Sequence, residues 1–164
     1  MLLGVLYLLF ALVLSHYFKE LFSKDFNRRQ DNSINGALNY GYSIIRGAIA
    51  RSLTMYGFLP VLGIHHHNEL NQFNLVDDLM EPYRSIVDYW VYHNVKVDQI
   101  IDSNLKVRLY DLLNYSIEID RKQHKILNAI DITIRSLSSS FRSKNYKLIK
   151  LPSLLKNLVQ HEYE

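Results

Sequence analysis

The sequence predicts a single, mainly α-helical domain. Apolar residues recur at the spacing of a helix over several long stretches. The chain has only 6 Gly and 3 Pro, fewer turn residues than a β-sandwich or barrel requires. Hydrophobic residues make up 48% of the chain and aromatic residues 12%, which excludes a disordered protein. A length of 164 residues suits one domain with its own core.

The first long helix is predicted over residues 33–56, with Gly57 ending it. One of its faces carries a polar stripe that consists of Asn35, Asn39, Tyr42 and Arg46. A second helix is predicted from Asn74, as its N-cap, to about His93. Pro82 lies inside this second helix and is expected to kink it near Asp78.

The remaining pattern predicts shorter elements. Helices are expected at 105–113, at 123–141 and, more weakly, at 154–160. Ser116–Ile119 alternates polar and apolar residues, which favours at most a short strand or extended segment. Residues 58–73 form a connection with Pro60, Gly63 and three adjacent histidines.

Residues 1–15 form a separate apolar segment. The uncharged run of residues 1–14 spans about 21 Å as a helix, short of the ~30 Å hydrocarbon core of a bilayer. The first basic residue is Lys19, so the charge that precedes a secretory signal is absent from the sequence. A buried helix is therefore expected and no membrane partner, with a small membrane-anchored protein as the alternative. The chain has no Cys, which suits the reducing cytoplasm.

Charge is distributed unevenly along the chain. Residues 61–104 hold two basic and seven acidic groups, whereas residues 105–164 hold eleven basic and six acidic groups. An acidic centre between basic flanks suits a metal-dependent enzyme that acts on a polyanion. Solvated helix faces produce the same pattern by chance, so charge alone leaves both interpretations open.

The strongest candidate for chemistry lies between Gly63 and Arg84. His65, His66 and His67 lie in the connection, and Asp77, Asp78 and Glu81 follow on a helix. A mixed set of imidazole and carboxylate ligands suits manganese, magnesium with retained waters, or zinc. The alternatives are a solvated histidine loop and acidic residues that serve only the helix dipole. Four arginines could contact phosphates or simply be solvated charges: Arg28, Arg29, Arg46 and Arg51.

Three motifs resemble those of the CRISPR-associated spacer-acquisition endonuclease and integrase family, in its type II-like branch. They are NGALNYGYSIIRGAIAR (Asn35–Arg51), GIHHHN (Gly63–Asn68) and DDLMEPYR (Asp77–Arg84). The resemblance covers residues 16–164, including LYDLLNYSIEI and ILNAI. It implies a helical catalytic domain that uses Mg²⁺ or Mn²⁺ to cleave DNA and insert new spacers into a CRISPR array.

The resemblance also implies roles for individual residues and partners. His66 and Glu81 match catalytic metal ligands, and Asp78 is similar to an auxiliary acidic ligand. The implied partners are DNA (protospacer and CRISPR repeat), a small companion CRISPR-associated subunit and a second copy of the chain in a homodimer. The implied location is the cytoplasm.

The sequence departs from the family pattern at its N-terminus. The first metal ligand of the family, a glutamate, precedes the Tyr17-Phe18 pair by about two turns, but Leu8–Ala11 offers no carboxylate there. The β-rich N-terminal domain of the family is also missing from this sequence. We therefore expect a truncated member with residues 1–15 outside the family pattern, two of three ligands and impaired activity. The alternative is a non-catalytic helical module that binds DNA or a partner, or a gene remnant.

Overall fold

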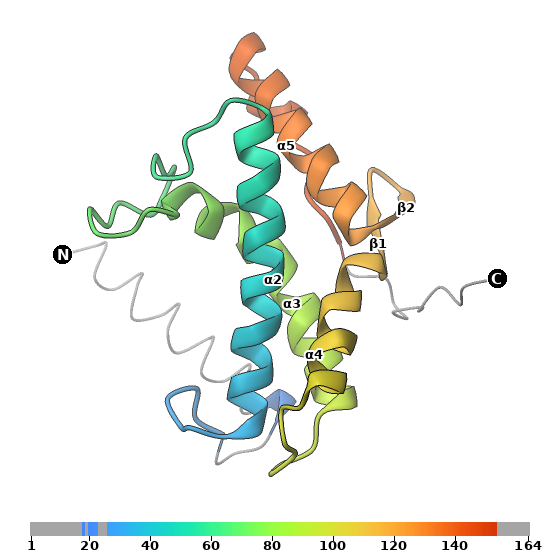
Figure 1. Ribbon diagram of the computed structural model, residues 1–164. Coiled ribbons are helices and arrows are strands. Elements are labelled where there is room, and N and C mark those ends of the chain that lie inside the picture. The colour runs from blue at the N-terminus through green and yellow to red at the C-terminus, as the bar shows by residue number, and fades with distance from the viewer. Residues whose placement is uncertain (1–17, 19, 23–25, 154–164) are drawn as a thin grey trace.

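The computed structural model describes residues 18, 20–22 and 26–153 (Figure 1). Within these ranges the chain is mainly helical, which confirms the predicted fold class. The helices are α2 (Ser33–Met55), α3 (Asn74–Asn94), α4 (Ser103–Tyr110) and α5 (Ile126–Ser143), with 3-10 turns η1 (Asp111–Asn114) and η2 (Tyr146–Leu148). One antiparallel hairpin joins β1 (Ser116–Ile119) to β2 (Lys122–Lys125). The apolar segment 1–15 and the helix expected at 154–160 lie outside the described residues.

Helix α2 is the long central element in Figure 1, and α3, α4 and α5 all pack against it. Asn32 caps its start by accepting a hydrogen bond from the backbone N–H of Asn35 at 2.9 Å. Gly57 follows its end with a φ of +78°, a left-handed conformation that glycine adopts without strain. The boundaries predicted for this helix are therefore confirmed.

Helix α3 begins where predicted, but the role expected of Asn74 is wrong. Asn74 is the first residue of the helix and is buried, while Phe73 occupies the cap position without a capping hydrogen bond. The Asn74 side chain turns into the preceding loop instead, because that loop offers backbone carbonyl groups that need donors. Pro82 lies within α3, which continues to Asn94.

The hairpin corrects the helix predicted at 123–141. Strand β1 has the predicted bounds, but Lys122–Lys125 pairs with it and α5 starts only at Ile126. Asp120 and Arg121 have φ values of 55° and 61°, the left-handed pair of a tight two-residue turn. Because β2 is mostly exposed and polar, it lacks the alternating apolar residues that indicate a strand. Ser153 forms a bridge to Glu118 in β1.

The core lies between α2, α3, α5 and β1. Its largest fully buried side chains include Leu38 and Ile45 of α2, Tyr83 and Ile86 of α3, and Ile117 of β1. The Tyr83 hydroxyl lies 2.9 Å from that of Thr133, a contact that ties α3 to α5. Across the described part of the chain, no helix combines the length and the apolar character that a membrane crossing needs.

Candidate active site

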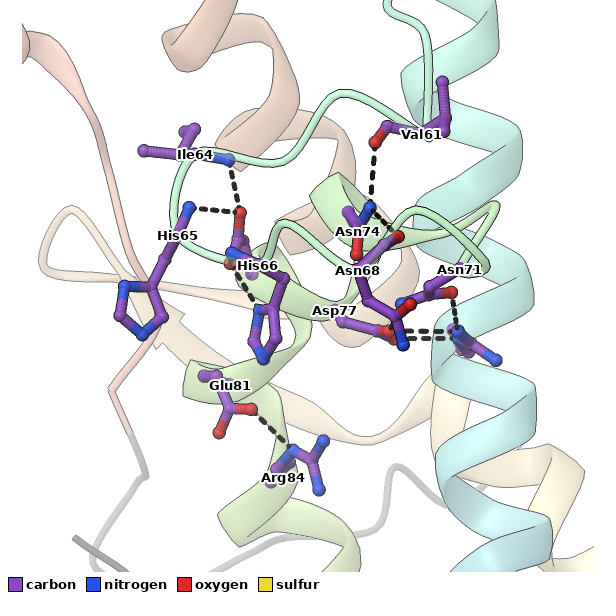
Figure 2. A network of polar contacts seen from close by, with 12 residues as sticks. Val61, Ile64, His65, His66, Asn68, Asn71, Asn74, Asp77, Glu81 and Arg84 are labelled. Atoms are coloured by element: carbon purple, nitrogen blue, oxygen red, sulfur yellow. Dashed lines mark hydrogen bonds and ion pairs between the residues drawn. The ribbon is translucent and has the colours of Figure 1, made fainter. Parts of the chain in front are cut away.

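The histidine loop between α2 and α3 is held by one carboxylate of α3. Asp78 accepts hydrogen bonds from the backbone N–H groups of Ile64, His65 and His66, at 2.5, 2.9 and 3.1 Å. The same carboxylate lies 2.6 Å from Nδ1 of the His66 ring, and only 7% of the Asp78 side chain is exposed. Figure 2 shows these bonds where the loop passes over α3. Asp78 thus fixes both the loop backbone and the His66 side chain.

Two further features close the loop. The side-chain amide of Asn74 donates hydrogen bonds to the carbonyl oxygens of Val61 at 3.2 Å and Asn68 at 2.9 Å (Figure 2). Gly63 packs so tightly that a Cβ atom there would lie 2.2 Å from the carbonyl oxygen of His66. This path of the loop therefore requires glycine at position 63.

Opposing effects act on the pKa of the Asp78 carboxyl group and leave it below its ordinary value. Burial raises the pKa, but the hydrogen bonds from the His65 backbone, the His66 ring and the Ile64 and His66 backbones outweigh it. The ionised carboxylate accepts a hydrogen bond from the Nδ1–H group of His66, which favours the tautomer of the ring that carries its hydrogen on Nδ1. Nε2 is then the nitrogen with a free lone pair, as in histidines that bind metal ions.

Glu81 follows Asp78 by three residues, which places it one turn further along the same face of α3. Figure 2 shows the His66 ring directed toward the side of α3 that carries Glu81. An imidazole nitrogen and a carboxylate oxygen form a donor set that suits a divalent cation. In residues 18, 20–22 and 26–153, no three His, Asp or Glu side chains come together as a metal site. The stretch Leu8–Ala11, where the family has its first ligand, lies outside those residues.

The other predicted residues of the motif have different surroundings. His65 and His67 are exposed, and the His65 ring packs edge-on against His66 with 5.6 Å between ring centroids. The Asp77 carboxylate binds Arg46, with 2.8 Å between Oδ1 and Nε and 2.9 Å between Oδ2 and Nη2. His66 is therefore the member of the histidine run whose ring contacts the Asp78 carboxylate. The metal-binding roles of His66, Asp78 and Glu81 stay predictions.

A polar hollow of about 390 Å³ opens beside His66, between α2 and α3. We call it the basic hollow; its lining includes Arg28, Asn39, Tyr42, Arg46, His66 and Arg84. Its acidic lining residue, Asp77, is already paired with Arg46. The concentration of positive charge suits phosphate groups of a nucleic acid.

The four arginines predicted to contact DNA differ in their surroundings. Arg28 lines the basic hollow and donates to the Oδ1 atoms of Asn35 at 2.5 Å and Asn39 at 2.7 Å, two members of the polar stripe of α2. Arg46 also lines the hollow but is committed to Asp77. Arg29 and Arg51 are exposed and do not line the basic hollow. DNA binding by all four stays a prediction.

Arg84 and a buried pair beneath the basic hollow were not among the functional residues predicted from the sequence. Arg84 lies on α3 one turn after Glu81, with 3.1 Å between its Nε and Oε1 of Glu81. The hydroxyl of Tyr42 donates a hydrogen bond to the carboxylate of Asp88, which is 3% exposed. Burial and the charge of Asp88 raise the pKa of Tyr42. The i, i+3 spacing of Glu81 and Arg84 was the available signal for Arg84.

An apolar hollow of about 330 Å³ lies on another side of His66. Glu81 lines it together with Ile64, Pro82, Leu137 and Ile149. His66 therefore lies where the basic and the apolar hollow meet.

Fold and site together define a class of protein: a helical domain in which a histidine oriented by a buried carboxylate lies at the edge of a basic hollow. The family model described as CRISPR associated protein Cas1 matches residues 9–126, well over half of the chain. The chain belongs to the Cas1 family, which confirms the resemblance seen in the sequence.

Individual relatives agree with this assignment. The CRISPR-associated endonuclease Cas1 of Neisseria meningitidis serogroup C (strain 8013) is 41% identical over 151 residues, which are 90% of this chain and 49% of the relative. The CRISPR-associated endonuclease Cas1 1 of Francisella tularensis subsp. novicida (strain U112) is 34% identical over 122 residues, 69% of this chain and 38% of the relative. The chain thus spans half or less of the length of these curated relatives.

A solved structure gives the same result for the fold. A casposase bound to integration product superimposes with a TM-score of 0.64 over 80% of this chain and 45% of that one. The two sequences are 23% identical, so this likeness shows a shared fold.

Proposed function

We propose that the chain forms the DNA-processing half of a divalent-metal-dependent endonuclease and integrase that inserts new spacers into a CRISPR array. The observation that carries the proposal is the His66 ring, oriented by Asp78 at the edge of the basic hollow, with Glu81 on the same helix face. Curated relatives named endonucleases support it. The casposase bound to integration product supports strand transfer as the reaction class.

The roles of the side chains follow from their chemistry. His66, through Nε2, and Glu81, through its carboxylate, would hold Mg²⁺ or Mn²⁺. The bound cation would polarise the phosphodiester and stabilise the leaving oxygen. Asp78 keeps the imidazole in the tautomer that presents Nε2. Because the attacking group in strand transfer is a DNA 3′-hydroxyl, the protein supplies positioning and charge rather than a covalent nucleophile.

The basic hollow would hold the DNA backbone beside His66. Contacts from guanidinium groups to phosphates give affinity that is largely independent of sequence and depends strongly on salt. Protospacer and CRISPR-repeat DNA are the proposed substrates. The companion subunit, the homodimer and the cytoplasmic location are carried over from the family resemblance and stay predictions.

Cleavage and strand transfer on branched and linear DNA with Mn²⁺ test the proposal. The purified full chain is compared with His66→Ala, Glu81→Ala and, as a matched control, His67→Ala. His67 adjoins His66 but is exposed. We expect His66→Ala and Glu81→Ala to lose activity by at least tenfold, on the order of one lost catalytic interaction, and His67→Ala to retain it.

The contrary result has a definite meaning. A folded wild-type chain without activity, indistinguishable from His66→Ala, would contradict the proposed enzymatic activity. It would favour the non-catalytic module that binds DNA or a partner. Circular dichroism and the fluorescence of Trp90, the single tryptophan, establish that each variant is folded.

A further inference from the structure

We propose that Arg84 couples metal binding to DNA binding. Its guanidinium group pairs with the Glu81 carboxylate when no cation is bound. When a cation binds Glu81 instead, the guanidinium group turns to a DNA phosphate. This inference deepens the proposed function and rests on it, because Glu81 is one of the proposed ligands. It assigns Arg84 a role in positioning the DNA, whereas the sequence motifs gave this residue no role.

The contact between Arg84 and Glu81 is of a kind that is easily exchanged. Nε of Arg84 lies 3.1 Å from Oε1 of Glu81, yet this buried N–H group makes no aligned hydrogen bond to any acceptor. The two side chains are 37% and 38% exposed. An ion pair that is partly solvated and lacks good hydrogen-bond geometry stabilises a structure only weakly. A doubly charged cation competes for the same carboxylate with the advantage of charge.

The Arg84 side chain already borders the place to which it would turn. It lines the basic hollow, and its Cζ atom lies 5.2 Å from the ring centroid of Tyr42. Arg28 contacts the same ring at 5.6 Å, so two guanidinium groups converge on Tyr42. The hydrogen bond from Tyr42 to Asp88 holds this ring in place. A phosphate in the hollow could therefore reach Arg84 through side-chain rotation alone.

The other two arginines of the hollow have different hydrogen-bond partners from Arg84. Arg46 makes two well-aligned hydrogen bonds to Asp77, at 2.8 and 2.9 Å, and also donates to Asn71 at 3.2 Å. Arg28 donates to two neutral asparagine side chains. Arg84 is therefore the guanidinium group of the hollow that pairs with a proposed metal ligand.

Thermodynamic linkage gives the consequence. If DNA draws Arg84 away from Glu81, DNA must increase the affinity for the cation, and the cation must increase the affinity for DNA by the same factor. The site would then bind a cation tightly chiefly when a DNA backbone lies beside it.

Titrations with Mn²⁺, followed by the electron paramagnetic resonance signal of free Mn²⁺, test this coupling without an activity readout. The full wild-type chain is compared with Arg84→Gln and Arg28→Gln, each with and without a short DNA duplex. Without DNA, we expect Arg84→Gln to bind Mn²⁺ about two- to fivefold more tightly than wild type, the range of an exposed ion pair. The increase in Mn²⁺ affinity caused by DNA should be smaller in this variant by a similar factor.

The control variant separates coupling from a general effect of charge. Arg28→Gln removes the same charge from the same hollow and should bind DNA more weakly, yet at saturating DNA it should keep the wild-type increase in Mn²⁺ affinity. Arg84→Lys, which keeps a positive charge, should restore part of the coupling.

Each contrary outcome is informative. Equal Mn²⁺ affinities of wild type and Arg84→Gln without DNA would overturn the coupling but leave the proposed function intact, provided that His66→Ala abolishes Mn²⁺ binding. Equal DNA-induced increases in the two glutamine variants would also overturn the coupling. A folded wild-type chain that binds no Mn²⁺ with or without DNA would overturn the proposed function and the coupling together.

Discussion

At the scale of single residues, Asp78 connects the parts of the site, because its carboxylate holds both the histidine loop and the His66 ring. The sequence placed Asp78 and Glu81 on one helix face, because helical spacing determines which residues are neighbours. The three backbone bonds from the loop to Asp78 could not be predicted in this way. They depend on the backbone conformation of the loop, which the residue types of the GIHHHN motif do not determine. Spacing therefore predicted the candidate ligands but not the contacts that orient them.

Asp78→Asn should lower the free energy of unfolding by about 1–3 kcal/mol at pH 7, because the loop N–H groups lose their charged acceptor. The pKa of Asp78 is lower in the folded protein than its ordinary value of 3.8. The contribution of the carboxylate is therefore complete above that value and is lost as the pH falls through the lower, folded pKa. The stability difference between wild type and variant should be constant from pH 7 to about pH 5 and narrow below 3.8.

Urea unfolding followed by Trp90 fluorescence measures this difference at each pH. Asp98→Asn is the matched control, since it makes the same chemical change at an exposed position. It should change stability by less than about 0.5 kcal/mol. A difference between wild type and Asp78→Asn that stays the same through the acid range would contradict the ionic role of Asp78.

At the scale of elements, the site depends on how closely α2 approaches α3. Apolar periodicity predicted both helices because each buries one stripe. It did not predict that Gly41 is the point of close approach. A Cβ atom at position 41 would lie 2.5 Å from Cγ1 of Val87. Strand β2 was missed for a related reason: its conformation comes from pairing with β1 and not from its own polar residues.

Gly41→Ala should destabilise the protein by about 1–3 kcal/mol, because Val87 must move to admit the methyl group. Gly47→Ala provides the matched control within the same helix. A Cβ atom there meets nothing within 4 Å, so the change should stabilise the protein by about 0.5–1 kcal/mol through helix propensity. Urea unfolding measures both. In a Val87→Ala background, Gly41→Ala should destabilise the protein less. Equal changes in stability from Gly41→Ala and Gly47→Ala would contradict close packing at Gly41.

At the scale of the whole molecule, the unevenly distributed charges have two roles: acidic side chains make structural contacts, and basic side chains line the hollow beside His66. The acidic centre was interpreted as a metal site or as solvated helix faces. In the structure Asp77 pairs with Arg46, Asp78 holds the loop and Asp88 accepts from Tyr42, so much of the acidity maintains the structure. Arg28, in the segment before α2, is held at the hollow beside His66 by its hydrogen bonds to Asn35 and Asn39 of α2. Charge counts along the chain could not reveal this, because the partner of each charge is set by tertiary contacts.

The same arrangement predicts which basic residues determine the salt dependence of DNA binding. The logarithm of the binding constant should fall linearly with the logarithm of the salt concentration between about 50 and 200 mM. Arg28→Gln should reduce that slope by about one, because it removes one of the phosphate contacts proposed for the basic hollow. Arg51→Gln removes the same charge from an exposed position of α2 outside the hollow and should leave the slope unchanged. Fluorescence anisotropy with a labelled duplex measures both slopes. An equal reduction by Arg51→Gln would instead support the contact between Arg51 and DNA that the sequence predicts.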